Sequence, residues 1–118
     1  MPRYVLLLHQ MPADYAAVTP AEMTDLIARY AAWSRDLREK DVVKDGFKLT
    51  NDGGRHLVRS GKGITATDGP YSEAKEVLGG LFVIEAADDG AAEAVAQSCP
   101  HLHAMPHSWV ELRRIHEV

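Results

Sequence analysis

The segment from Asp68 to Gly80 carries the densest group of side chains that could do chemistry. Between two glycine breaks it holds three carboxylates, a lysine and a tyrosine, namely Asp68, Glu73, Glu76, Lys75 and Tyr71. Glu73 and Glu76 are three residues apart, so a helical turn would place them on one face. Asp68, Glu73 and Glu76 could hold a proton or a cation in a pocket. The other interpretation is a turn cap and a solvated helical face, which is the commoner use of charged turns.

A second group of chemically useful residues lies in the C-terminal strand predicted over 108–115. Period-two alternation divides this strand into two faces. The first face carries His107, Trp109, Glu111, Arg113 and Ile115, and the second carries Ser108, Val110, Leu112 and Arg114. The first face mixes an indole, a carboxylate and a guanidinium, which suits a pocket wall or an interface. Arg113 would hold a carboxylate or phenolate. The second face suits packing against helices.

His9 ends the first predicted strand and could act as an acid or base at the mouth of a pocket. A lone histidine at a strand end is more often a surface or hydrogen-bonded residue. We keep His9 as a candidate catalytic residue together with Asp68 and Glu73. Substrate binding is assigned to the remaining candidates, Tyr71, Glu76, Trp109, Glu111 and Arg113.

The loop from Cys99 to His107 holds a cysteine, three histidines and a methionine, all of them possible metal ligands. His101 and His103 would point the same way in an extended chain. Two prolines make the segment a loop, however, and we expect opportunistic nickel or zinc binding rather than a physiological site. We therefore assign no metal site. No phosphate-binding loop or dinucleotide fingerprint occurs, so nucleotide binding is not expected and no cofactor is assigned.

The elements that must position these residues follow from hydrophobic patterning. Residues 4–8 and 81–84 are continuously apolar, which predicts strands covered on both faces. Thr19-Pro20-Ala21-Glu22 reads as a capping box that begins a helix of about five turns. A strand over 42–49 is followed by a glycine-rich turn and a hairpin formed by 56–60 and 64–67. One or two helical turns over 72–78, ended by Gly79-Gly80, and a helix over 90–98 complete the set.

Without the hairpin and the turn at 68–78, this order is βαββαβ, the ferredoxin-like α+β sandwich. Two helices cover one face of such a sheet and leave the other bare, although residues 4–8 and 81–84 are apolar on both sides. We therefore predict a homodimer, a dimeric αβ-barrel assembly, in which two sheets pack face to face around a cavity.

Composition limits the class of protein. The chain has 118 residues, enough for one domain over 1–118, and a net charge of −4 that disfavours direct binding of nucleic acid. Its longest apolar run is far shorter than the roughly 20 residues of a membrane span, so no membrane partner is expected. The single Cys99 suits a reducing cytoplasm.

The Asp68-Gly69-Pro70-Tyr71 opening and the Glu76-x-x-Gly79-Gly80 ending resemble the signature of the DGPF subgroup of the YCII-related family. The likeness extends to the first strand, the capping box, Cys99-Pro100 and Glu111-Leu112-Arg113. It implies a small dimeric protein of the ferredoxin-like, dimeric αβ-barrel type. Most relatives have no assigned activity, and Tyr71 replaces the usual phenylalanine.

The wider family is regarded as enzymatic because of a His–Asp pair, and a dehydrochlorinase belongs to it. The resemblance places that histidine at Glu22 and that aspartate at Cys99, so the pair is not matched here. Whether the chain is an enzyme stays open. It could bind a small acidic or aromatic metabolite and perform cofactor-free proton-transfer or lyase chemistry. Alternatively it is a non-catalytic interaction module, linked to transcription initiation because some relatives are fused to sigma-factor-like regions. A metal-responsive protein using the 99–107 loop is a third hypothesis.

Overall fold

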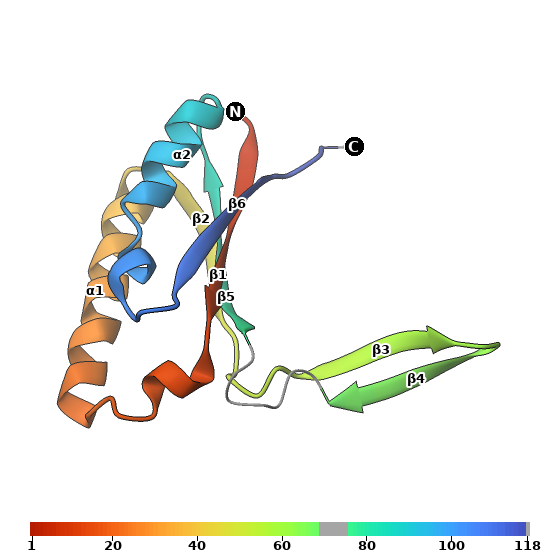
Figure 1. Ribbon diagram of the computed structural model, residues 1–118. Helices are drawn as coiled ribbons and strands as arrows, with labels where there is room; N and C mark the ends of the chain where they lie inside the picture. Colours follow the sequence, from red (N-terminus) through yellow and green to blue (C-terminus); the bar gives the residue numbers. More distant parts are fainter. Residues whose placement is uncertain (69–75, 118) are drawn as a thin grey trace.

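The computed structural model describes residues 1–68 and 76–117, which form an α+β fold with two helices on one face of a sheet (Figure 1). The main sheet is antiparallel, with strand order β2-β5-β1-β6. This order is compatible with the predicted ferredoxin-like fold. The elements are β1 (Arg3–Gln10), α1 (Pro20–Glu39), β2 (Val43–Lys48), β3 (Arg55–Ser60), β4 (Gly63–Asp68), β5 (Val77–Glu85), α2 (Asp89–Gln97) and β6 (Trp109–Arg114). Short 3-10 helices lie at Pro12–Tyr15 and Pro100–His103.

The N-terminal cap of α1 agrees with the prediction, and α2 is capped by a side chain as well. The Glu22 backbone N–H donates to Thr19 Oγ1 at 3.2 Å, and the Thr19 backbone N–H donates to Glu22 Oε1 at 3.2 Å. This is the reciprocal pattern of a capping box. At α2, Asp88 accepts a hydrogen bond from the Ala91 N–H at 2.8 Å. Side chains thus satisfy backbone donors that each helix leaves free at its start.

The core lies between the helices and one face of the sheet. Alternate residues of β1 point into it, with Tyr4, Leu6 and Leu8 buried. Ile84 of β5 is fully buried beside them, and the Tyr4 hydroxyl donates to Asp89 at the start of α2 at 2.7 Å. The opposite face of the same strands carries Val5, Leu7, Leu81 and Val83, all of them half-buried. The described residues hold no helix that covers this second face, which is called the open face below.

The predicted helical turn over 72–78 is wrong at its C-terminal end. Residues 69–75 lie outside the described residues, but Val77 and Leu78 already belong to β5. Gly79 and Gly80 continue this strand instead of ending a helix. A Cβ on Gly80 would lie 2.8 Å from the Phe47 carbonyl oxygen, and one on Gly79 would collide with the Gln10 side chain. The two glycines therefore allow neighbouring strands to approach closely.

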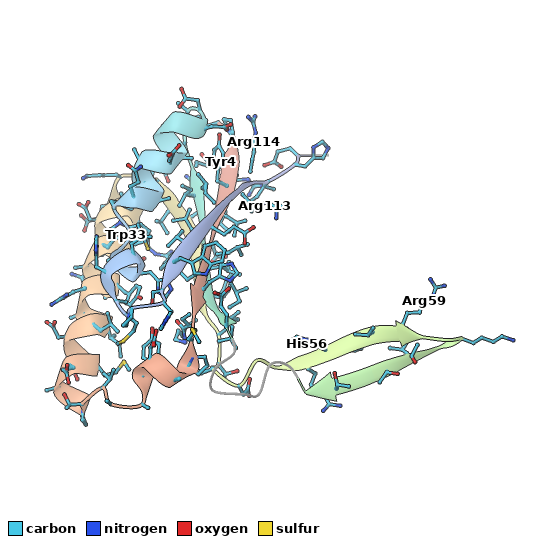
Figure 2. The ribbon with its side chains drawn as sticks, viewed as in Figure 1. Tyr4, Trp33, His56, Arg59, Arg113 and Arg114 are labelled. Carbon is cyan, nitrogen blue, oxygen red and sulfur yellow. The ribbon has the colours of Figure 1, made fainter. Side chains whose placement is uncertain are left out.

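Strands β3 and β4 form the predicted hairpin, which projects from the body as a separate two-stranded arm (Figures 1 and 2). Leu57, Val58 and Ile64 on this arm are 69%, 59% and 68% exposed. The arm contributes to a radius of gyration of 16.1 Å, whereas a compact chain of this length has about 13.5 Å. An isolated two-stranded hairpin has little stability of its own in water.

Candidate functional site

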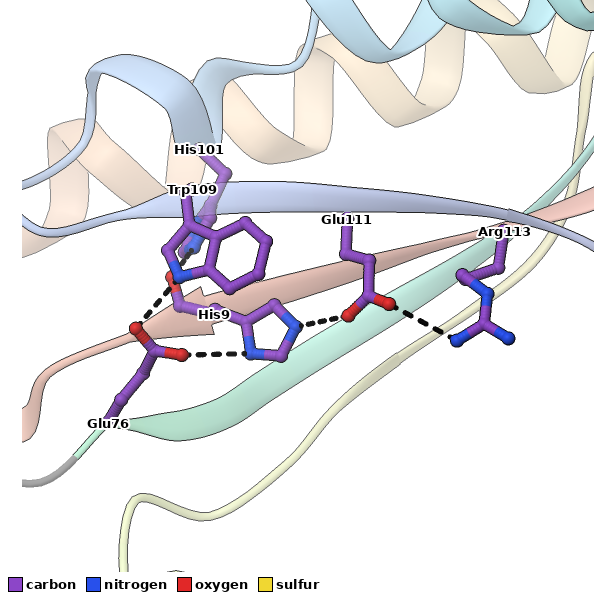
Figure 3. A network of polar contacts seen from close by, with 6 residues as sticks. All are labelled: His9, Glu76, His101, Trp109, Glu111 and Arg113. Atoms are coloured by element: carbon purple, nitrogen blue, oxygen red, sulfur yellow. Dashed lines mark hydrogen bonds and ion pairs between the residues drawn. The ribbon is translucent and has the colours of Figure 1, made fainter.

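Strand pairing assembles a polar cluster on the open face. In the β1–β6 register, His9 is opposite Trp109, Leu7 is opposite Glu111 and Val5 is opposite Arg113. His9 and the three β6 side chains therefore share one face, as the alternation of the last strand predicts. Glu76, immediately before β5, joins them from the neighbouring strand (Figure 3).

The imidazole of His9 lies between two carboxylates. Its Nε2 is 3.0 Å from Glu111 Oε1, and its Nδ1 is 3.5 Å from Glu76 Oε1. The ring stacks on the Trp109 indole with 4.1 Å between centroids and 10° between planes. Trp109 Nε1 donates to Glu76 Oε2 at 2.8 Å, which fixes that carboxylate beside the histidine. The two carboxylates and the indole together fix the orientation of the ring, which is what a catalytic histidine requires.

Arg113 completes the cluster at its exposed end. Its Nη1 donates to Glu111 Oε2 at 3.3 Å. Hydrogen bonds from His9, and secondly from Arg113, hold the pKa of the Glu111 carboxyl below its usual range. The His9 side chain is 19% exposed and that of Arg113 is 67% exposed, so accessibility to solvent rises along the cluster. Arg113 keeps donors that could bind an arriving anion.

A buried histidine holds the backbone of His9 from the helix side. His101 Nε2 lies 2.8 Å from the His9 carbonyl oxygen, and His101 Nδ1 lies 2.6 Å from the Tyr30 hydroxyl. Burial lowers the pKa of His101, which favours its neutral form. A neutral ring that donates from Nε2 to the carbonyl accepts from the Tyr30 hydroxyl at Nδ1. The sequence identifies His101 only as a possible metal ligand, because nothing local indicates its partners.

The structure brings together five of the eight predicted site residues, namely His9, Glu76, Trp109, Glu111 and Arg113. Tyr71 and Glu73 lie outside the described residues. Asp68 ends β4, at the base of the arm, where its backbone pairs with Arg55. His107 does not join this face as predicted, because β6 begins at Trp109 and the His107 Nδ1 instead lies 3.0 Å from Asp14 Oδ1.

The 99–107 loop does not have the extended geometry assumed for a chelating site. Pro100–His103 is a 3-10 helix in which His101 is buried and His103 is exposed. Burial raises the pKa of the Cys99 thiol to about 11, which disfavours the thiolate that binds metals. In residues 1–68 and 76–117, no group of three histidine, cysteine or acidic side chains is arranged to hold a metal ion.

No helix among the described residues has the length and hydrophobicity required to cross a membrane.

Comparison with known proteins identifies the family of the chain. A search of curated proteins finds no match. A family model described as the YCII-related domain matches residues 2–118, almost the whole chain. The chain therefore belongs to the YCII-related family.

Proposed function

We propose that the protein binds a small acidic or aromatic metabolite on the open face and moves a proton on it, with His9 as the acid or base. The observation that carries this proposal is the His9 ring held between Glu111 and Glu76 and stacked on Trp109. A histidine with a fixed orientation and a carboxylate partner is a usual general acid–base arrangement. Proton-transfer and lyase reactions of this kind need no cofactor.

The two ring nitrogens have different roles in this proposal. Nε2 makes the shorter contact, 3.0 Å to Glu111, so Glu111 orients the ring. Nδ1 has the longer contact, 3.5 Å to Glu76, and is the nitrogen that a substrate proton would reach. Arg113 binds the substrate anion and Trp109 supplies an apolar surface for its ring. We assign Asp68, Tyr71 and Glu73 to the same site from their sequence alone.

The proposal includes a homodimer that closes the site. The open face carries half-buried Val5, Leu7, Leu81 and Val83 beside the His9 cluster. A second copy packed sheet against sheet would remove these apolar side chains from water and enclose the cluster. Leu7→Asp should then shift sedimentation velocity from a dimer to a monomer, whereas Ala28→Asp on the exposed surface of α1 should not. A monomeric wild type at micromolar concentration would refute the dimer.

The subgroup and the cellular location also remain proposals. The sequence of residues 68–80 supports membership of the DGPF subgroup of the family. A single cysteine that is fully buried is compatible with a protein of the cytoplasm.

A thermal-shift screen of small carboxylic and phenolic compounds tests the proposed function. A ligand present at a hundred times its dissociation constant adds about 2.7 kcal/mol of stability, or roughly 11 °C for a chain of this length. Arg113→Gln should abolish this shift, whereas Arg29→Gln, on the outer surface of α1, should leave it unchanged. His9→Gln should keep binding but abolish exchange of substrate protons with deuterated solvent. Equal shifts in both arginine variants would contradict the assignment.

A non-catalytic interaction module is the second candidate, and the arm favours it. Leu57, Val58 and Ile64 are exposed on a hairpin that stands away from the body (Figure 2). Leu57 and Ile64 lie on one face of this ribbon and Val58 on the other, because successive strand residues point to opposite sides. Exposed apolar side chains of this kind mark sites of protein association. If this candidate is correct, Leu57→Ser should weaken binding to a protein partner while the ligand screen finds no stabilising compound. Relatives fused to sigma-factor-like regions suggest a partner of the transcription machinery.

A further inference from the structure

A large cavity lies between α1 and the sheet, on the opposite side of the sheet from the His9 cluster. Its volume is about 520 Å³, within the range of small-molecule sites. The first half of α1 supplies Met23, Leu26 and Ile27, and the sheet supplies Leu8 and Phe82. These side chains make the walls predominantly apolar.

The cavity exists because α1 does not bury its apolar stripe. The described α1 contains no buried residue, and Ile27 is 58% exposed despite its helical spacing from Met23 and Tyr30. Trp33 packs edge-on against Phe82 with 5.0 Å between centroids, so the second half of the helix does contact the sheet. The apolar residues of the first half therefore face a space that the chain itself leaves unfilled.

Two cations lie at this cavity, Arg38 of α1 and Lys48 of β2. None of the described residues that line it carries a carboxylate. Lys48 Nζ donates to the carbonyl oxygens of Leu49 at 2.6 Å and Gly79 at 3.2 Å, which leaves one of its three N–H groups available. Partial burial lowers the pKa of Lys48, as expected for an ammonium with no anion beside it.

The neutral polar side chains of the cavity already have hydrogen-bond partners, and Ser34 Oγ accepts from Arg38 Nε at 3.2 Å. The Tyr15 hydroxyl donates to Gln10 Oε1 at 3.3 Å, and Gln10 Nε2 donates to Asn51 Oδ1 at 2.6 Å. His101 and Tyr30 form the hydrogen bond described above. The charged donors that remain for a ligand are on Lys48 and on the terminal nitrogens of the Arg38 guanidinium.

We infer that this cavity binds an amphipathic monocarboxylate, with its apolar body along α1 and its carboxylate at Lys48 and Arg38. Apolar walls select the body by the area they remove from water. The available Lys48 N–H would form a charge-assisted hydrogen bond with the carboxylate, and Arg38 would add a second donor. This site is separate from the open face and does not depend on the function proposed for His9.

Titration with sodium decanoate below its micelle concentration tests the inference. Isothermal titration calorimetry should show one site per chain, and 1-decanol should bind more weakly because it lacks the charge. Lys48→Met should weaken decanoate binding roughly tenfold, the scale of one hydrogen bond to a charged group, and leave decanol binding unchanged. Lys40→Met is the matched control, because Lys40 pairs with Asp36 on the helix surface and does not line the cavity.

Amide NMR locates the bound molecule independently of the energetics. The backbone N–H signals of Gly46, Gly79 and Gly80, which line the cavity, should shift with decanoate, whereas those of the arm should not. Ala31→Trp, which adds an indole at the cavity wall, should abolish both the heat of binding and the shifts. The inference is overturned if decanoate does not bind, if Lys48→Met and Lys40→Met bind it equally, or if the shifts map to the open face.

Discussion

His101→Leu is the most informative single substitution for the link between the core and the site. The wild-type ring is 1% exposed and bridges the His9 carbonyl oxygen and the Tyr30 hydroxyl at 2.8 Å and 2.6 Å. Leucine approximates its bulk but offers neither a donor nor an acceptor. Two hydrogen bonds worth about 0.5–1.5 kcal/mol each are lost, and the His9 carbonyl loses a buried partner. We expect a total cost of roughly 2–3 kcal/mol.

For 118 residues this cost lowers the melting temperature by roughly 8–12 °C. Calorimetry should show this fall for His101→Leu and almost none for His103→Leu, because His103 is exposed in the same 3-10 helix. This matched pair separates the buried hydrogen bonds from any general effect of removing a histidine. Equal melting temperatures for the two variants would refute the reasoning.

The pH dependence of the same variant provides a second readout. Burial lowers the pKa of His101 in the folded state, so the unfolded chain binds the proton more readily. Wild-type stability should therefore be complete above the ordinary histidine pKa of about 6.5 and decline as the pH falls below it. His101→Leu should lose this part of the acid sensitivity, whereas His103→Leu should retain it. Identical pH slopes for the two variants would contradict the assignment of a neutral, buried His101.

Three further predictions concern the elements around the site. Thr19→Ala removes the α1 capping box and should cost about 1 kcal/mol, measured by urea unfolding; no change would show that the cap is dispensable. Gly80→Ala places a Cβ 2.8 Å from the Phe47 carbonyl oxygen and should cost about 1–3 kcal/mol by the same assay, whereas a neutral result would disprove the close strand contact. Cys99 is fully buried and its pKa is raised to about 11. Mass spectrometry should therefore find it unmodified by iodoacetamide at pH 8 until the protein is denatured. Rapid modification of the native protein would contradict its burial.

Local patterns predict much of the fold because their causes are local. The capping box at Thr19 needs only residues within one helical turn, and it is present as predicted. Alternation in the last strand depends on backbone geometry, so Trp109, Glu111 and Arg113 share a face as expected. Without the hairpin, the observed elements follow the predicted order βαββαβ. The strand order of the main sheet is compatible with the ferredoxin-like fold.

The errors occur where distant residues decide the local structure. Gly79 and Gly80 resemble a helix end, but they are needed because Gln10 and Phe47 of neighbouring strands approach them. The helix α1 likewise carries apolar residues at helical spacing but buries none of them, because how closely a helix packs on a sheet depends on the volumes of both surfaces.

The site is only partly predictable for the same reason. The types and alternation of Trp109, Glu111 and Arg113 identify them as candidates, but the contact of His9 with Glu111 depends on the register of two strands about a hundred residues apart. His101 is missed as a positioning residue because both of its partners are remote in sequence. Sequence spacing therefore identifies the residues that could do chemistry better than it identifies the residues that hold them in position.

The most direct test of the central claim is the ¹⁵N NMR spectrum of the His9 ring, assigned with His9→Gln, in the presence and absence of the strongest compound from the acid screen. We expect the Nδ1 signal to move on binding, because the substrate replaces the long contact with Glu76. The Nε2 signal should change little, because Glu111 keeps its 3.0 Å contact. Saturating ligand with both ring signals unmoved would show that His9 is not the acid–base group of the site.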